Sequence, residues 1–229
     1  MFSWQQLEEN PDGTALTVLA GHNRFHGKIY RTSFIKEHEI CFSEECPRAN
    51  EDIGFNYACR WINQQLTRKD HIDHILEIEE PMVVWKHEGP SIVRANNYAY
   101  YFKDQNLGLA LNSEHAVKIA IKNEVDMDII SETLYGAMAC MHTFYLSTIS
   151  KRPEFVEDAL AGALYFYKNV FLKYAIIDPI KMKDAFYENL LSFLNDPGDP
   201  MRQNLLTFDY AGFLDMLQGL VNEEEKLGG

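Results

Sequence analysis

The second half of the chain has the apolar spacing of amphipathic helices. From residue 113 onward, apolar residues recur every three or four positions, and this period lines one face of a helix. Pro153 and Pro179 both stand where proline is tolerated, in the first turn of a following helix. The pattern therefore predicts a helical region over 113–229, with Ser113 as its first N-cap, a last helix over about 209–222 and a frayed tail.

The first half has a mixed pattern. Short apolar or alternating runs, punctuated by glycine and proline, predict strands at 14–19, 38–42, 74–80, 81–86 and 96–102. Helical spacing is confined to 31–38 and 52–66. We therefore expect an α+β protein: a mixed α/β region over 1–112, with the helical region over 113–229 packed on it.

Composition and charge exclude several classes of function. The 229 residues are 46% apolar and carry 34 acidic against 21 basic side chains, a net charge of −13. This composition fits a globular protein, and so acidic a chain argues against nucleic acid as a partner. No apolar run is long enough to cross a membrane, and the first residues do not resemble a signal peptide. With four cysteines and no C-x-x-C pair, we expect reduced thiols and a cytoplasmic location.

Two kinds of metal motif occur in weak contexts. His22 and His26 are four residues apart, and His71 and His74 are three apart, spacings that suit zinc on a helix. Neither pair has a firm helical context or an evident third ligand, so we predict no metal site. The D-x-D at 126–128 falls between predicted helices, where an N-cap or first-turn acid is the better interpretation.

The stretch RANEDIGFNYACRW at 48–61 places two adjacent acids at the start of an amphipathic run. A structural interpretation is available, because Asn50 can cap a helix while Glu51 and Asp52 in its first turn complement the helix dipole. A catalytic interpretation is equally open from these residues alone. The residues on either side of the stretch decide between the two.

An ordered set of residues surrounds the acid pair. It reads Gly27-Lys28, Tyr30-Arg31, Ser33-Phe34-Ile35, Ile40, Phe42, Arg48, Asn50-Glu51-Asp52, Phe55 and Asn56. In order and spacing this set resembles the acceptor-side half of family 2 glycosyltransferases of the GT-A type. The segment VVWKHEGPSIVRANN at 83–97 resembles the region after the last sheet strands of such enzymes. The resemblance covers about residues 14–102 and implies a partial GT-A-like fold there.

The resemblance implies an inverting transfer of a hexose from a nucleotide sugar to an acceptor hydroxyl on a glycan or another molecule. It assigns the role of general base to Asp52, with Glu51 beside it. The basic side chains near the pair could offset diphosphate charge or position the acceptor. Trp85 could stack on a sugar, and an interior aromatic at the end of a strand is an equally open interpretation of it. The candidate substrate-binding residues are His26, Lys28, Arg31, Arg48, Asn50 and Trp85.

The sequence departs from the family in the donor-binding half. That half carries parallel strands and a D-x-D before the acid pair, whereas only 50 residues precede Glu51 here. We therefore expect no cofactor in this chain, and a donor-binding half or partner chain that could bring Mn²⁺ or Mg²⁺. The alternative is a non-catalytic protein-interaction module that retains the acid pair as a helix cap.

Overall fold

The computed structural model describes residues 30–45, 50–71, 98–194 and 210–228, and this part of the chain is built from helices. The α-helices are α3 (Thr32–Glu37), α4 (Glu51–Asp70), α5 (Tyr98–Lys122), α6 (Met127–Lys151), α7 (Val156–Phe166), α8 (Leu172–Tyr174), α9 (Pro179–Leu194) and α11 (Tyr210–Gly228). A 3₁₀ turn (Pro153–Phe155) precedes α7, and a π-helical turn (Tyr167–Phe171) joins α7 to α8. The helix starts predicted at Pro153 and Pro179 are confirmed.

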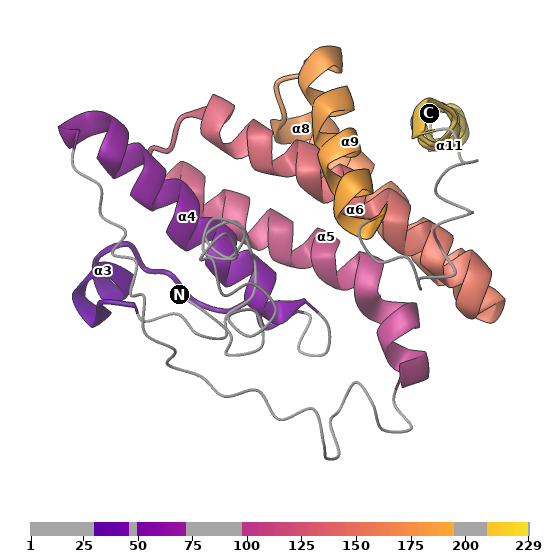
Figure 1. Cartoon of the computed structure of the whole chain (residues 1–229), viewed down its shortest axis with the longest axis horizontal. Coiled ribbons are helices and arrows are strands. Elements are labelled where there is room, and N and C mark those ends of the chain that lie inside the picture. The colour runs from indigo at the N-terminus through magenta and orange to yellow at the C-terminus, as the bar shows by residue number, and fades with distance from the viewer. Residues whose placement is uncertain (1–29, 46–49, 72–97, 195–209, 229) are drawn as a thin grey trace.

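Helix α5 is the centre of the bundle. It packs against α4, α6 and α7, while α9 lies on α6 (Figure 1). Its buried face includes four polar side chains: Gln105, Asn106, Asn112 and Ser113. Gln105 donates to the Thr148 hydroxyl on α6 at 3.1 Å, and Asn106 donates to the Ala159 carbonyl on α7 at 2.8 Å. These hydrogen bonds give two of the four side chains, Gln105 and Asn106, a partner inside the bundle.

The predicted α+β fold with a GT-A-like mixed α/β part is wrong for the described residues, which contain no strand. Residues 38–42 are the end of a turn and irregular backbone, and Tyr98–Phe102 are the first turns of α5. Polar residues on the buried face of α5 interrupt its apolar period, and for this reason the aromatic run before them resembled a strand. For the same reason Ser113 resembled an N-cap; that prediction is wrong, because Ser113 lies inside α5. The predicted strands at 14–19, 74–80 and 81–86 lie outside the described residues.

The boundary that we placed at residue 112 lies within α5, so one continuous helix belongs to both halves of the sequence. Helix α4, from the first half, packs on α5 and also contacts α6. Trp61 of α4 is fully buried, and its indole N–H donates to the Thr133 hydroxyl of α6 at 2.8 Å. The described residues from both halves therefore share one core.

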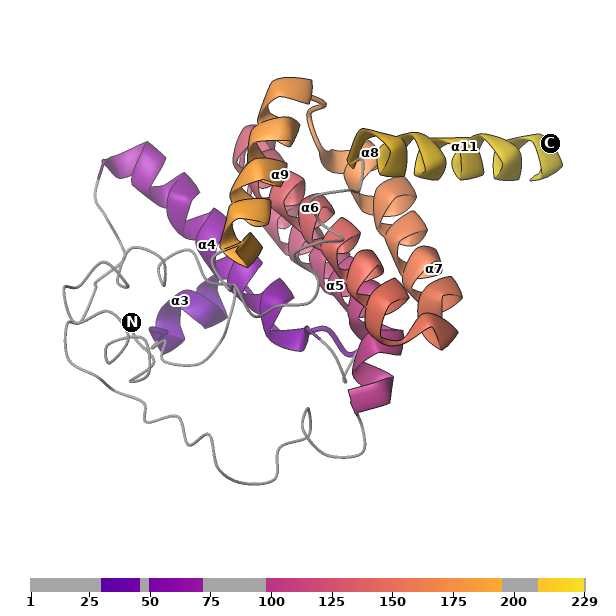
Figure 2. The same cartoon turned by 45° about the vertical axis from the view of Figure 1, so that its right-hand side comes forward.

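An aromatic cluster joins α6, α9 and α11. His142 of α6 is fully buried, and its ring lies 5.6 Å from Phe186, 5.5 Å from Tyr210 and 5.0 Å from Phe213 between centroids. Phe186 and Tyr210 stack at 4.4 Å. Burial raises the pKa of the Tyr210 phenol. The cluster fixes the start of α11, whereas its far end projects from the bundle (Figure 2). The frayed tail predicted after residue 222 is wrong, since α11 continues to Gly228.

Gly162 allows α7 to approach α5 closely. A Cβ atom at this position would lie 2.5 Å from the Leu107 backbone nitrogen, so an alanine must push the two helix backbones apart. We expect Gly162→Ala to lower the free energy of unfolding by about 1–3 kcal/mol, the usual cost of overpacking. Urea unfolding followed by far-UV circular dichroism measures this change.

Gly136 of α6 is the matched control. It is also a helical glycine, but a Cβ atom there would meet nothing within 4 Å. Gly136→Ala should therefore stabilise the protein by up to about 1 kcal/mol, because alanine has the higher helix propensity. A stabilising effect of both substitutions would contradict the close contact between α5 and α7.

Candidate active site

The described residues include four of the eight predicted site residues: Arg31, Asn50, Glu51 and Asp52. All four lie at the start of a helix. Arg31 is the N-cap residue of α3, Asn50 is the N-cap residue of α4, and Glu51 and Asp52 are in the first turn of α4. Arg31 and Glu51 are exposed, and Asp52 is half-buried. The other four, His26, Lys28, Arg48 and Trp85, lie outside the described residues.

Asn50 does not cap α4 with its side chain, so the capping interpretation of this residue is wrong. Its backbone is left-handed, with φ of 59°, and its side chain makes no hydrogen bond to the helix end. The side-chain amide of Asn50 instead donates to the backbone carbonyl of Gln105 on α5 at 2.8 Å. Asn50 therefore anchors the start of α4 to α5, and this contact fixes where Glu51 and Asp52 lie.

A second glycine brings the same end of α4 close to α5. A Cβ atom at Gly54 would lie 2.5 Å from the backbone carbonyl oxygen of Asn112. The first turn of α4 is thus held by the Asn50 hydrogen bond and by this close backbone approach. A site carried by this turn would be fixed by the bundle rather than by a loop, which favours a defined geometry.

Tyr30 and Asn56 form a polar group beside Asp52. The Tyr30 hydroxyl donates to the Asn56 side-chain oxygen, and the Asn56 amide donates to the Asp52 backbone carbonyl at 2.7 Å. Burial raises the pKa of the Tyr30 phenol, and the nearby Cys59 and Asp52 groups raise it further. Tyr30 therefore remains a neutral hydrogen-bond donor near the acid pair.

Aromatic rings cover this group on one side. The Phe55 ring meets Tyr30 edge-on at 5.1 Å and stacks on Phe42 at 4.6 Å between centroids. Phe42 is 42% exposed, so part of the aromatic surface faces solvent next to the start of α4. Exposed aromatic faces are suited to stacking on the apolar face of a sugar ring.

The structure thus gathers Tyr30, Phe42, Asp52, Phe55 and Asn56 around one helix end. All five belong to the ordered set in the sequence, but only Asp52 was among the predicted site residues. The ordered set in the sequence was the signal that could have identified Tyr30, Phe42, Phe55 and Asn56. Its members come from two segments of the chain, and these segments meet at α4. We name this group the α4 cluster.

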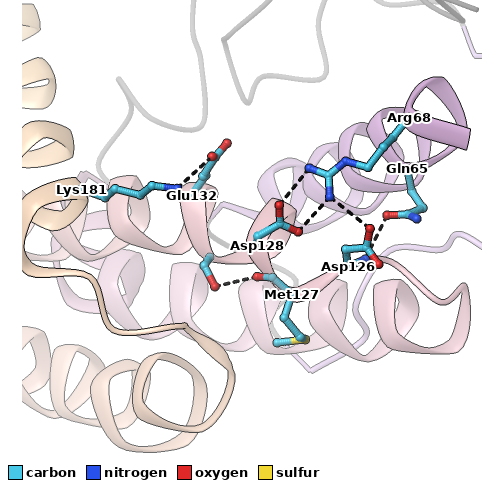
Figure 3. Close-up of polar contacts among 8 residues, drawn as sticks. Gln65, Arg68, Asp126, Met127, Asp128, Glu132 and Lys181 are labelled. Carbon is cyan, nitrogen blue, oxygen red and sulfur yellow. Dashed lines mark hydrogen bonds and ion pairs between the residues drawn. The ribbon is translucent and has the colours of Figure 1, made fainter. Parts of the chain in front are cut away.

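The D-x-D aspartates are engaged in an ion pair between helices (Figure 3). Arg68, near the end of α4, contacts Asp126 at 3.0 Å and Asp128 at 2.9 Å. The hydrogen bond from Arg68 lowers the pKa of the Asp128 carboxyl. Asp126 is the N-cap residue of α6 and Asp128 lies in its first turn, as predicted, although Asp126 makes no side-chain cap hydrogen bond.

The described ranges hold no group of three His, Cys, Asp or Glu side chains arranged for a metal ion. His71 ends α4 as its C-cap residue, whereas His22, His26 and His74 are not described. None of the described helices has both the length and the apolar content needed to cross a bilayer.

Comparison of the chain with protein-family models, with curated proteins and with solved structures finds no match.

Proposed function

We propose that this chain is the acceptor-side component of an inverting glycosyltransferase, with Asp52 as the general base. The observation that carries the proposal is the α4 cluster, in which half-buried Asp52 lies in the first turn of a 20-residue helix. The cluster also contains the stacked Phe42–Phe55 pair, of which Phe42 is 42% exposed. The positive end of the helix dipole is complementary to a carboxylate.

The proposed reaction transfers one proton and one hexosyl group. The Asp52 carboxylate takes the proton of the acceptor hydroxyl while the acceptor oxygen attacks the anomeric carbon. The bond from that carbon to the diphosphate breaks, the nucleoside diphosphate leaves with the bonding electron pair, and the configuration inverts. Glu51, exposed and adjacent, would face the same acceptor.

The remaining predicted residues keep their proposed roles in binding. Arg31 and Arg48 would offset charge or orient the acceptor through charged hydrogen bonds, as would Lys28. His26 and Trp85 would contact the sugars. These roles rest on the resemblance in the sequence, because only Arg31 of the five is described, as an exposed side chain.

We assign donor binding to another segment or to a partner chain. Nucleotide sugars are bound in this family through a D-x-D, whereas Asp126 and Asp128 here are held by Arg68. A divalent cation, Mn²⁺ or Mg²⁺, would then accompany the donor half. The chain has four cysteines and no C-x-x-C pair, and we propose a cytoplasmic location on that basis.

We expect this chain alone to bind nucleotide sugars with Kd above about 1 mM, equivalent to less than about 4 kcal/mol of binding free energy. The reason is that both D-x-D carboxylates are engaged with an arginine. Isothermal titration calorimetry with UDP-glucose, UDP-N-acetylglucosamine and GDP-mannose, with and without Mn²⁺, tests this.

Micromolar, Mn²⁺-dependent binding would contradict the assignment of the donor site to another segment. The double variant Asp126→Asn with Asp128→Asn then identifies the ligands, because it would abolish such binding only if these aspartates hold the metal. The non-catalytic alternative, an interaction module, predicts no transfer by this chain with any donor-binding partner.

A further inference from the structure

Cys41 and His115 are in contact, although they are 74 positions apart in the sequence. Cys41 lies in the irregular segment after α3, and half-buried His115 lies on α5. The Nε2 atom of His115 is 3.6 Å from the Cys41 sulfur and 3.1 Å from the backbone carbonyl oxygen of Cys41. The fold therefore brings a nucleophilic side chain and an imidazole together at one place on the surface.

The two contacts of His115 fix which ring nitrogen carries a proton. A backbone carbonyl only accepts hydrogen bonds, so Nε2, at 3.1 Å from the Cys41 oxygen, is a protonated nitrogen. The same N–H has the Cys41 sulfur as a second acceptor at 3.6 Å. Hydrogen bonds to an ionised acceptor are the stronger ones. The pair thus places a donor against the sulfur in the form that reacts, the thiolate.

Contacts on both sides of Cys41 hold it against α5. Ile40, before it, is 5% exposed and belongs to the core. His38 and Asn123 of α5 exchange two hydrogen bonds, one between Nδ1 and Oδ1 at 2.7 Å and one from the Asn123 amide to the His38 carbonyl at 3.0 Å. Phe42, after it, stacks within the α4 cluster. A site held by such packing has a defined geometry.

Solvent reaches Cys41 more easily than the other described thiols. Cys41 is exposed, whereas Cys59 is buried and Cys140 is intermediate. Reactive cysteines are partly exposed and lie beside groups that stabilise the thiolate, while buried structural cysteines are inert. Cys41 combines exposure with the His115 N–H, so a small reagent in solution can reach its sulfur.

The charged side chains near the pair are more acidic than basic. Glu39 pairs with Lys122 at 2.5 Å. Glu114, the residue before His115, pairs with Lys118 at 2.9 Å. Two further acids after Cys41 are exposed, Glu44 and Glu45. Because the local surplus of charge is negative, it favours a cationic reagent over an anionic one.

We propose that Cys41 is a modification site that exchanges with small cationic disulfides, assisted by the His115 N–H. The Cys41 thiol gives its proton to water, and the thiolate attacks one sulfur of the disulfide. A new S–S bond forms, the S–S bond of the reagent breaks, and the leaving thiolate takes a proton from water. Cys41 is thereby oxidised to a mixed disulfide and half of the reagent is reduced. The proposal is independent of the function assigned to Asp52.

The test measures the rate at which the full chain exchanges with cystamine at neutral pH, by mass spectrometry of its peptides. The background variant is Cys46→Ser, because trypsin leaves Cys41 and Cys46 in one peptide, 37–48. We expect Cys41 to react at least about tenfold faster than Cys59 and Cys140, because it is exposed beside a donor. Dithiothreitol should release the adduct, and anionic glutathione disulfide should react more slowly than cystamine.

The contribution of His115 is measured with His115→Phe, which keeps a planar ring but removes the N–H. Losing one hydrogen bond to a charged group lowers the thiolate fraction about tenfold. The more basic sulfur recovers part of this loss through higher nucleophilicity, so exchange at Cys41 should slow about threefold. His115→Gln, which retains a side-chain N–H, should react faster than His115→Phe.

The matched control is His71→Asn, which removes a histidine at the end of α4. Its backbone is left-handed, with φ of 61°, a conformation that asparagine tolerates. This variant should exchange at the wild-type rate.

Exchange of His115→Phe at the wild-type rate overturns the proposal, because Cys41 would then react as an ordinary exposed thiol. Equal rates at Cys41 and Cys59 overturn it as well, as does faster exchange with glutathione disulfide than with cystamine. Circular dichroism verifies that His115→Phe is folded. The rate at buried Cys59 gives a second check, since it rises only when the fold opens.

Discussion

Asp52→Asn should reduce hexosyl transfer by about 10²–10⁴-fold in the enzyme completed with its donor-binding segment or chain, the range typical of losing a general base. Asparagine keeps the size and shape of aspartate but cannot accept the acceptor's proton. Its effect on stability should be small, about 0.3–1 kcal/mol, the usual size of the interaction between a first-turn carboxylate and the helix dipole. Initial rates of nucleoside diphosphate release and a thermal melt measure the two effects separately.

Asp158→Asn is the matched control for this substitution. Asp158 also lies in a first helical turn, that of α7, and is half-buried like Asp52. The same change there should cost a similar, small amount of stability and leave transfer unchanged. Near-normal transfer by Asp52→Asn would refute its role as the base. The acid pair would then be a structural helix start, and the interaction module would become the better account of the chain.

Trp61→Ala should lower the free energy of unfolding by about 3–5 kcal/mol, the usual cost of truncating a buried tryptophan. The side chain is fully buried between α4 and α6, stacks on Tyr57 at 5.3 Å and donates to Thr133 at 2.8 Å. Urea unfolding followed by far-UV circular dichroism measures the loss without relying on tryptophan fluorescence. Such a loss is a large share of the stability of a typical domain.

Two further variants separate the causes of this loss. Trp61→Phe keeps an aromatic ring in the core but removes the hydrogen bond to Thr133, so it should cost less than the alanine variant. Leu227→Ala, at a side chain that is 89% exposed, should change stability by less than about 0.5 kcal/mol. A loss for Trp61→Ala no larger than that of Leu227→Ala would contradict the packing of α4 against α6.

Local signals predicted the helices whose buried faces are mostly apolar. Prolines marked the starts at Pro153 and Pro179, and the predicted helix at 52–66 is found as α4 over Glu51–Asp70. The position of the acid pair in the first turn of α4 was also predictable, since short polar and acidic residues cluster at helix starts.

The same rules failed where buried positions are polar. Gln105 and Asn106 of α5 lie inside the bundle because α6 and α7 supply their hydrogen-bond partners. A polar residue in a linear sequence gives no sign of such a distant partner, so the period of α5 was missed and its first turns were predicted as a strand. In the folded protein this aromatic run is helical, so the tertiary structure overrode its local preference for a strand.

The sequence alone thus determined which stretches are helical wherever apolar residues keep the helical period, and it placed Glu51 and Asp52 at a helix start. Only the tertiary structure decided that Asn50 bonds to α5 instead of capping α4, that Tyr30 and Asn56 join Asp52, and that Arg68 holds Asp126 and Asp128. The physical reason is that helical period and helix-end preferences act over a few residues. Those contacts, by contrast, join side chains from distant segments, and they form only when the bundle brings these segments together.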